Sequence, residues 1–404
     1  MLLRNRGSMK RIAFVAPWYG DNIPGGAEAA LRGITDHLFA AGMDIEILTT
    51  TVEKFTADWN KDFYKPGSYT SKNGIPIRRF KIRKRNTAAF DAVNAKLIQK
   101  SGLTLEEENT FHKEMINSPD LYDYIRENRA QYSCFVFIPY MFGTTYWGVQ
   151  ACPGQAVLIP CFHDESYAHM KTFRTVYSEV AGMLFNAQDL TEHLCDTSRM
   201  KTEVMGLGMD TKLTYDADRF RKKYNINDPF ILYAGRKDKG KNIDTLVQYF
   251  KRYKQNEQDN LKLVLIGGGE LEIPTEIKND VYDLGFVDLQ DKYDAYGAAT
   301  LLCQPSKNES FSFVIMESWL CRRPVLVHEG CAVTKNFVSC CNGGLYFGNY
   351  YDFQETVKYI LNHPDIADIM AKNGHDYVCD NFAWDIMVEK YKRFFKELEE
   401  QHAK

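Results

Sequence analysis

The sequence predicts an α/β protein with two Rossmann-like domains, each built on a parallel sheet, that face each other across a cleft. Short apolar runs alternate with helical segments along nearly the whole chain, which is the pattern of βαβ units. This alternation restarts after a polar connector at residues 206–229, which we take as the hinge. The length of 404 residues also exceeds what one ordinary core holds, so two domains are expected.

The first domain is expected at residues 9–205. It opens with a β-rich run at 11–16, a glycine-containing loop, and a helix at 27–41 in which apolar residues recur every three or four positions. Further strands are predicted at 44–50, 75–82, 134–139, 156–160, 182–185 and 202–205, and helices within 88–129, at 145–150 and at 188–196. Residues 51–74 and 88–129 match no pattern that indicates a function.

The second domain is expected at residues 206–381 and repeats the alternation of strands and helices. Strands are predicted at 230–234, 261–266, 281–284, 300–303 and 324–327, and helices at 243–253, 289–298, 311–320, 353–361 and 366–379. A last helix is predicted at 384–398, in the closing segment 382–404. Because parallel strands end at the same edge of a sheet, the loops that follow them are the expected ligand sites.

Composition limits the classes of function. A net charge of -3 gives no general case for nucleic-acid binding. The 10 cysteines are scattered without a Cys-x-x-Cys pair and several lie in apolar runs, which favours buried thiols and a reducing, cytoplasmic location. No apolar run reaches the ~18 residues of a membrane span. Residues 1–8 are polar and are expected to be an expression leader, since they lack the apolar segment of a signal peptide.

Two glutamates lie near the start of the helix predicted at 311–320 and inside it. Glu309 falls in the loop before it and Glu317 about two turns inside it. Eight residues at ~100° each leave the two carboxylates ~80° apart around a helix, so both can face one cleft. Beside a helix N-terminus that favours anions, they suggest a ligand that carries both hydroxyls and phosphate. The alternative is a loop cap and a solvated helix glutamate, because this spacing is common by chance.

Basic residues follow the strand predicted at 230–234. Arg236 offers a planar fork to phosphate oxygens, and Lys241 offers a mobile point charge. Together they can hold a diphosphate, while Glu317 accepts from a ribose diol and Glu309 from sugar hydroxyls. The alternative is a solvated, lysine-rich loop.

Three features of the first domain carry further hypotheses. Gly25 and Gly26 precede a helix and can bring backbone N–H groups close to a phosphate, although a glycine pair often marks only a tight turn. His163 follows a buried strand in the loop His-Asp-Glu, where a single histidine is otherwise usually structural. The basic run 78–85 is either a charged strand end or a patch for an anionic acceptor or a membrane surface.

Together these segments resemble the retaining GT-B glycosyltransferases commonly grouped as family 4, over nearly all of residues 9–404. The similar segments are Gly25-Gly26-Ala27-Glu28, His163-Asp164-Glu165, Gly235-Arg236 with Lys241, Gly285-Phe286-Val287, Glu309 to Glu317 with Pro324-Val325, and Asn342-Gly343-Gly344-Leu345. The stretch from Glu309 to Val325 is the most specific. The closing segment at 382–404 resembles a helix that packs back on the first domain.

The resemblance implies roles for the matching residues. Arg236 and Lys241 would bind the donor diphosphate, Glu317 the ribose, Glu309 the donor sugar, and His163 the sugar ring. The remaining donor-binding residues that it implies are Gly25, Gly26, Gly235, Phe286, Ser310, Phe311 and Ser312. One departure is that Ser310-Phe311-Ser312 stands where the family usually has glycines, which alters the N–H groups around the sugar.

The expected activity is metal-independent transfer of a sugar, in the hexosyltransferase class, from a nucleotide-diphosphate sugar to a glycan, lipid-linked or other hydroxyl acceptor, as in polysaccharide biosynthesis. The donor is a substrate, and no cofactor or metal is expected. The expected partners are the donor and the acceptor, with a peripheral contact to a membrane. No nucleic-acid partner is expected. Positive Arg236 and Lys241 would stabilise the departing diphosphate. Two alternatives are a GT-B epimerase or phosphorylase, and a non-catalytic nucleotide-sugar binding protein.

Overall fold

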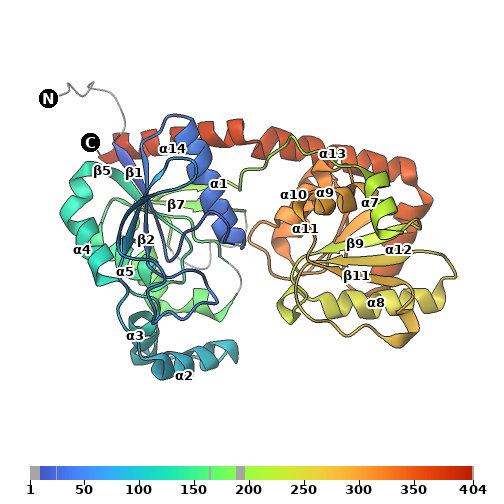
Figure 1. Ribbon diagram of the computed structural model, residues 1–404, viewed down its shortest axis with the longest axis horizontal. Coiled ribbons are helices and arrows are strands. Elements are labelled where there is room, and N and C mark those ends of the chain that lie inside the picture. The colour runs from blue at the N-terminus through green and yellow to red at the C-terminus, as the bar shows by residue number, and fades with distance from the viewer. Residues whose placement is uncertain (1–9, 24, 163–164, 188–195, 403–404) are drawn as a thin grey trace. The chain divides into compact units, whose positions relative to one another are not determined.

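The computed structural model describes residues 10–402 except 24, 163–164 and 188–195. Its chain forms two compact units. Unit 1 comprises Met1–Gly208 and Met387–Lys404, and unit 2 comprises Met209–Ile386. Each unit is an α/β layer structure around its own mostly parallel sheet (Figure 1), which confirms the predicted fold class of two Rossmann-like domains. The leader, His163 and nearly all of the helix predicted at 188–196 lie outside the described residues.

The sheet of unit 1 has eight strands in the order β3-β4-β2-β1-β5-β6-β7-β8. Their bounds are β1 Arg11–Ala16, β2 Ile45–Thr50, β3 Gly67–Thr70, β4 Pro76–Phe80, β5 Tyr132–Phe137, β6 Ala156–Leu158, β7 Gly182–Phe185 and β8 Lys201–Val204. Only the edge pair β3 and β4 is antiparallel among the described strands of this sheet. The central strands are buried along their whole length, which explains why they read as continuous apolar runs.

The helices of unit 1 are α1 Gly26–Ala40, α2 Thr87–Ile98, α3 Leu105–Glu114, α4 Pro119–Asn128, α5 Gly143–Ala151, α6 Lys171–Tyr177 and most of α14 Trp384–His402. The stretch predicted as helical over 88–129 is therefore three helices. Thr104 caps α3 in a reciprocal capping box with Glu107, and Pro119 begins α4. Helix α14 packs on the sheet so closely that a Cβ at Gly182 would lie 2.8 Å from the ring of Phe394.

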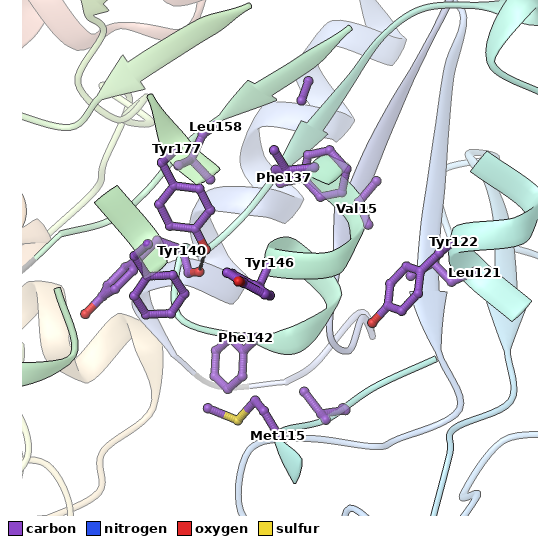
Figure 2. Packing of buried hydrophobic residues seen from close by; sticks show 14 of the residues in the cluster. Val15, Met115, Leu121, Tyr122, Phe137, Tyr140, Phe142, Tyr146, Leu158 and Tyr177 are labelled. Carbon is purple, nitrogen blue, oxygen red and sulfur yellow. Dashed lines mark hydrogen bonds between the residues drawn. The ribbon is translucent and has the colours of Figure 1, made fainter. Parts of the chain in front are cut away.

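The core of unit 1 is rich in aromatic rings (Figure 2). Strand residues such as Val15, Phe137 and Leu158 meet rings that come from the loops and helices around α5. The hydroxyl of Tyr177 donates to the backbone oxygen of Tyr140, so that a buried tyrosine keeps a hydrogen-bond partner. Tyr140 and Phe142, which follow β5, belong to this core, so the segment after β5 is anchored by it.

The sheet of unit 2 has six parallel strands in the order β11-β10-β9-β12-β13-β14. Their bounds are β9 Phe230–Ala234, β10 Lys262–Ile266, β11 Val281–Gly285, β12 Leu301–Gln304, β13 Val325–His328 and β14 Gly344–Phe347. The chain moves outward from β9 through β10 to β11, and then returns to β12 on the other side of β9. The neighbouring strands β9 and β12 therefore mark the topological switch point, where ligands bind in open α/β sheets.

The helices of unit 2 are α7 Ala217–Tyr224, α8 Ile243–Asn256, α9 Leu289–Ala298, α10 Phe313–Leu320, α11 Ala332–Cys341, α12 Tyr350–Asn362 and α13 Pro364–Phe382. In Figure 1, α8 and α12 lie on one side of the sheet and α9 and α10 on the other. The elements β3, β14, α6 and α11 were not predicted from the sequence. The helix predicted at 311–320 begins two residues too early, because Ser312 adopts a left-handed conformation.

The connector predicted at 206–229 is not wholly irregular. It contains α7, which Asp216 caps and which ends at the left-handed Asn225. Arg219 of α7 forms an ion pair with the fully buried carboxylate of Asp294 on α9, and Phe220 is buried. The helix escaped the sequence analysis because its short turn pattern is mostly polar, and its stability comes from these tertiary contacts.

Candidate active site

Two loops meet at the switch point of unit 2, one after β9 and one after β12. Lys241 Nζ lies 2.7 Å from Glu309 Oε1, and the Asn242 side-chain amide donates to the backbone oxygen of Pro305 at 2.9 Å. Both charged groups are largely buried, with 23% and 9% of their side chains exposed. The structure therefore brings together two residues that the sequence analysis placed at a common ligand. The ion pair also neutralises Lys241, so an anionic ligand would compete with Glu309 for it.

Arg236 stands on the first of these loops with 76% of its side chain exposed. Its Nε lies 3.5 Å from Asp238 Oδ2, a contact too long and exposed to hold the guanidinium firmly. Gly235 before it has a φ of 155°, a positive value that residues with a side chain rarely adopt, and donates its N–H to the oxygen of Ile266 at 3.0 Å. The backbone at Arg236 is thus fixed while its charge remains available to a ligand.

The next residue, Lys237, was not singled out from the sequence, yet it anchors this loop. Its side chain is buried and pairs with Asp283 on β11, while its backbone N–H donates to Gly268 at 2.7 Å. Charge alone does not separate Lys237 from its neighbours Arg236 and Lys239. Only the structure shows that one basic residue of the run points inward.

The glycines after β10 let neighbouring loops sit directly on their backbone. A Cβ at Gly267 would lie 2.0 Å from the oxygen of Gly235, and one at Gly269 would lie 2.7 Å from the oxygen of Lys237. A Cβ at Gly268 would lie 2.4 Å from the ring of Phe286, which is itself 86% exposed. The Phe286 ring therefore rests on a glycine and leaves most of its surface open. This apolar ring stands at the same sheet edge as Arg236.

Glu317 is directed toward α9. Its carboxylate accepts from Lys292 Nζ at 2.8 Å and from the Tyr296 hydroxyl at 2.9 Å. Burial and the Glu317 charge raise the pKa of Tyr296 well above its usual value, so this hydroxyl stays a donor. Lys292 and Tyr296 are four residues apart and therefore lie on one face of α9. This spacing is visible in the sequence, but only the tertiary structure shows that Glu317 is their common partner.

The angle predicted between Glu309 and Glu317 does not apply, because Glu309 lies four residues before the first helical residue. Glu309 pairs with the β9 loop and Glu317 with α9. The two carboxylates are thus fixed by different neighbours rather than by one helix. Their separate positions are compatible with separate ligand groups, sugar hydroxyls at Glu309 and a ribose diol at Glu317.

The segment that replaces the family's glycines is mostly anchored in the core. The ring of Phe311 is buried against Phe337 and Phe382, at centroid distances of 5.5 and 5.1 Å, so its backbone rather than its ring is left for a ligand. Ser310 is half-buried, and Ser312 has a φ of 81°. The buried Ser312 hydroxyl and the Gln304 side-chain oxygen have no hydrogen-bond partner in the described part of the chain. Such groups favour a ligand that supplies one.

In unit 1, Gly25 and Gly26 lie at the N-terminus of α1, in the segment that follows β1. The parallel strands β1 and β5 are the neighbours between which the strand order of this sheet reverses. Gly25 has a φ of 138°, and a Cβ there would lie 2.0 Å from Glu28 Oε2. Gly26 is exposed and has open space where a side chain would stand. His163 falls outside the described residues. Its neighbour Glu165 accepts a hydrogen bond from Tyr140 at 2.7 Å.

The basic run 78–85 is largely engaged inside unit 1. The buried Arg79 guanidinium donates to backbone oxygens and lies 3.7 Å above the ring of Tyr64. Arg83 pairs with Glu114 at 3.2 Å, and Arg85 lies over Trp59. These contacts favour a structural role for the arginines over an anion-binding patch.

The structure supplies two further findings over the residues it describes. No group of three or more His, Cys, Asp and Glu side chains has a geometry suited to a metal ion. No described helix is both long and apolar enough to span a bilayer.

Comparisons with known proteins agree with this geometry. Residues 216–377, most of unit 2, match the family described as Glycosyl transferases group 1. An uncharacterized glycosyltransferase of Methanocaldococcus jannaschii, MJ1607, is 21% identical over 96% of this chain and 98% of its own. A D-inositol 3-phosphate glycosyltransferase of Gordonia bronchialis is 25% identical over 48% of this chain and 46% of its own.

Solved structures share the fold over most of the chain. Anabaena HepE in complex with UDP superimposes with a TM-score of 0.68 at 14% identity, over 96% of this chain and 100% of that one. Sucrose-phosphate synthase from Thermosynechococcus elongatus superimposes with a TM-score of 0.67 at 17% identity, over 96% of this chain and 99% of that one. At these identities the likeness establishes the GT-B fold. Together with the family match in unit 2, it supports a glycosyltransferase.

Proposed function

We propose that this chain, whose second unit carries a glycosyl transferases group 1 domain, is a retaining, metal-independent hexosyltransferase of family 4. It moves a sugar from a nucleotide-diphosphate sugar to a hydroxyl of a glycan or lipid-linked acceptor, as in polysaccharide biosynthesis. The observation that carries the proposal is the group at the switch point of unit 2. There the exposed Arg236 and the Lys241 of the Lys241–Glu309 pair lie on the same loop after β9. The solved structures of Anabaena HepE with UDP and with UDP-glucose support this class of donor.

The geometry suggests how a donor uses these groups. The diphosphate draws Lys241 away from Glu309 and takes a fork of hydrogen bonds from Arg236. Glu309 is then free to accept from sugar hydroxyls, so phosphate binding prepares the sugar site. Glu317, held by Lys292 and Tyr296, keeps lone pairs for a ribose diol. The Phe286 ring, supported by Gly268, offers an apolar surface at the same edge.

The chemical step follows from where charge develops. As the bond from the anomeric carbon to phosphate breaks, positive charge grows on the sugar and negative charge on the diphosphate. Arg236 and Lys241 stabilise the departing diphosphate, which is electrostatic catalysis. The acceptor oxygen attacks from the face that the diphosphate leaves, and a donor phosphate oxygen takes its proton. Glu309 and Glu317 are not a glycosidase acid and base, because neither needs to exchange a proton here.

A panel of nucleotides and nucleotide sugars in a thermal-shift assay tests the donor class. At 100 times its dissociation constant a ligand stabilises the fold by ~2.7 kcal/mol, which is easily detected. Proton NMR of the product then gives the anomeric configuration, and inversion refutes the retaining mechanism. Conversion of the donor without any acceptor identifies an epimerase, and binding without turnover over a wide acceptor panel identifies a binding protein.

We also propose a cytoplasmic location with peripheral contact to the inner membrane face. Cys134 and Cys303 are packed in central strands, and burial raises the pKa of both thiols, an environment that suits a reducing compartment. The support for membrane contact is the exposed Lys81 and Lys84 of the run 78–85, although Lys84 also donates to the backbone oxygen of Asn60 and the arginines of the run are engaged internally. Reversing these two lysines to Glu should abolish binding to anionic vesicles, and unchanged binding refutes the contact.

A further inference from the structure

The ring of Phe55 is exposed and yet firmly held. It is 57% exposed, and it packs in T-shaped geometry against Trp18, Trp59 and Phe142 at centroid distances of 5.9, 5.8 and 6.4 Å. The indole N–H of Trp59 also donates to the backbone oxygen of Phe55 at 3.0 Å. An exposed ring supported by three largely buried rings loses little conformational freedom when a ligand binds to it.

This aromatic cluster is assembled from three loops at one sheet edge. Phe55 and Trp59 follow β2, Trp18 follows β1 and Phe142 follows β5. These strands are neighbours in the sheet, and β1 and β5 form the switch point of unit 1. The cluster thus occupies the position where open α/β sheets bind ligands.

A carboxylate borders the cluster. Glu28 Oε1 accepts from the indole N–H of Trp18 at 2.7 Å, and Gly25 leaves room for Oε2. A carboxylate in this state has further lone pairs for ligand hydroxyls. Its negative charge disfavours a phosphorylated headgroup, and an alkyl chain has no hydrogen-bond donor for it. An aromatic face next to a hydroxyl acceptor matches a sugar ring, which has one apolar C–H face and an edge of hydroxyls.

We infer that unit 1 carries a carbohydrate-binding surface, in which the acceptor sugar stacks on Phe55 and donates a hydroxyl hydrogen bond to Glu28. This inference rests on the proposed function, since it assigns the acceptor to the class of glycans. The surface binds the acceptor without any contribution from the donor site of unit 2.

Saturation-transfer NMR on the full chain tests this surface without a nucleotide sugar. The probes are the methyl glycosides of glucose, galactose, mannose and N-acetylglucosamine, for which a dissociation constant on the order of 1 mM is expected. At least one should receive saturation, strongest on the protons of its apolar face. Phe55→Ala should weaken binding at least tenfold, and Phe55→Trp should retain it. Phe63→Ala is the matched control, because Phe63 is 62% exposed in the same segment and packs on Tyr64.

Three outcomes overturn the inference: no glycoside binds the wild type, Phe55→Ala binds as well as the wild type, or Phe63→Ala loses binding equally. Saturation of dodecyl phosphate in place of the glycosides, lost in Phe55→Ala, overturns the sugar class. Thermal denaturation checks that the variants are folded. If the glycosides bind but the nucleotide panel shows no shift, the proposed function fails and the surface stands. The reverse result refutes the surface alone.

Discussion

Replacing Arg236 by Ala separates catalysis from folding. Its side chain is 76% exposed, and its nearest carboxylate is 3.5 Å away. Truncation therefore removes little packing, and the free energy of unfolding should change by no more than about 0.5 kcal/mol. A ligand role predicts a much larger effect on turnover. Loss of one preorganised donor to a developing anion costs ~3–4 kcal/mol, or ~10²–10³ in rate.

The assay is single turnover with the nucleotide sugar that gives the largest thermal shift, so that product release does not hide the chemical step. Lys239→Ala is the matched control. Lys239 is an exposed cation on the same loop, and its loss changes the net charge by the same amount. If general electrostatics dominate, both variants slow equally. A rate for Arg236→Ala within threefold of wild type, or an equal loss in Lys239→Ala, refutes the role.

Three further predictions follow from the structure. Glu317→Ala should weaken binding of the nucleoside diphosphate in calorimetry and lower the free energy of unfolding by about 1–3 kcal/mol, because the buried Tyr296 hydroxyl loses its acceptor; unchanged affinity contradicts the ribose role. Turnover should survive EDTA, since Arg236 and Lys241 stabilise the leaving group, and loss that Mn²⁺ or Mg²⁺ restores contradicts this mechanism. Burial lowers the pKa of His112 to about 3, whereas the unfolded chain protonates near 6.5, so stability falls as the pH drops below 6.5. Between pH 7.5 and 5.5 the titration of His112 should lower the free energy of unfolding, measured by urea denaturation, by about 1.4 kcal/mol. The variant His112→Gln should lack this part of the pH dependence, and an equal pH dependence in both proteins refutes the prediction.

The sequence by itself determined the fold class and most of the elements. Strands such as 11–16, 182–185 and 230–234 were predicted with their observed bounds, because a strand covered on both faces must be apolar throughout. The helix at 289–298 was also predicted with its observed bounds. The positions of Arg236 and Lys241 after a strand placed them at the ligand edge of a parallel sheet, since that edge follows from chain direction alone.

Tertiary structure alone decided which polar groups are paired and which are available. Two neighbouring basic residues differ in their environment, because Lys237 is buried and pairs with Asp283 while Arg236 is exposed. Local sequence cannot distinguish them, because the partner is supplied by a strand 46 residues later. The helix α7 was missed for the same reason, as its stabilising partner Asp294 lies 75 residues further on.

The cluster around Phe55 shows the same limit most clearly. Its rings come from three segments separated by up to 124 positions, as in the pair of Trp18 and Phe142. Apolar and aromatic residues in the polar stretch 51–74 carry no periodicity, so they could not be told apart from a loop of no function. Only the pairing of β2, β1 and β5 in the sheet brings these loops together. Long-range strand pairing, which local patterns do not encode, therefore made this surface.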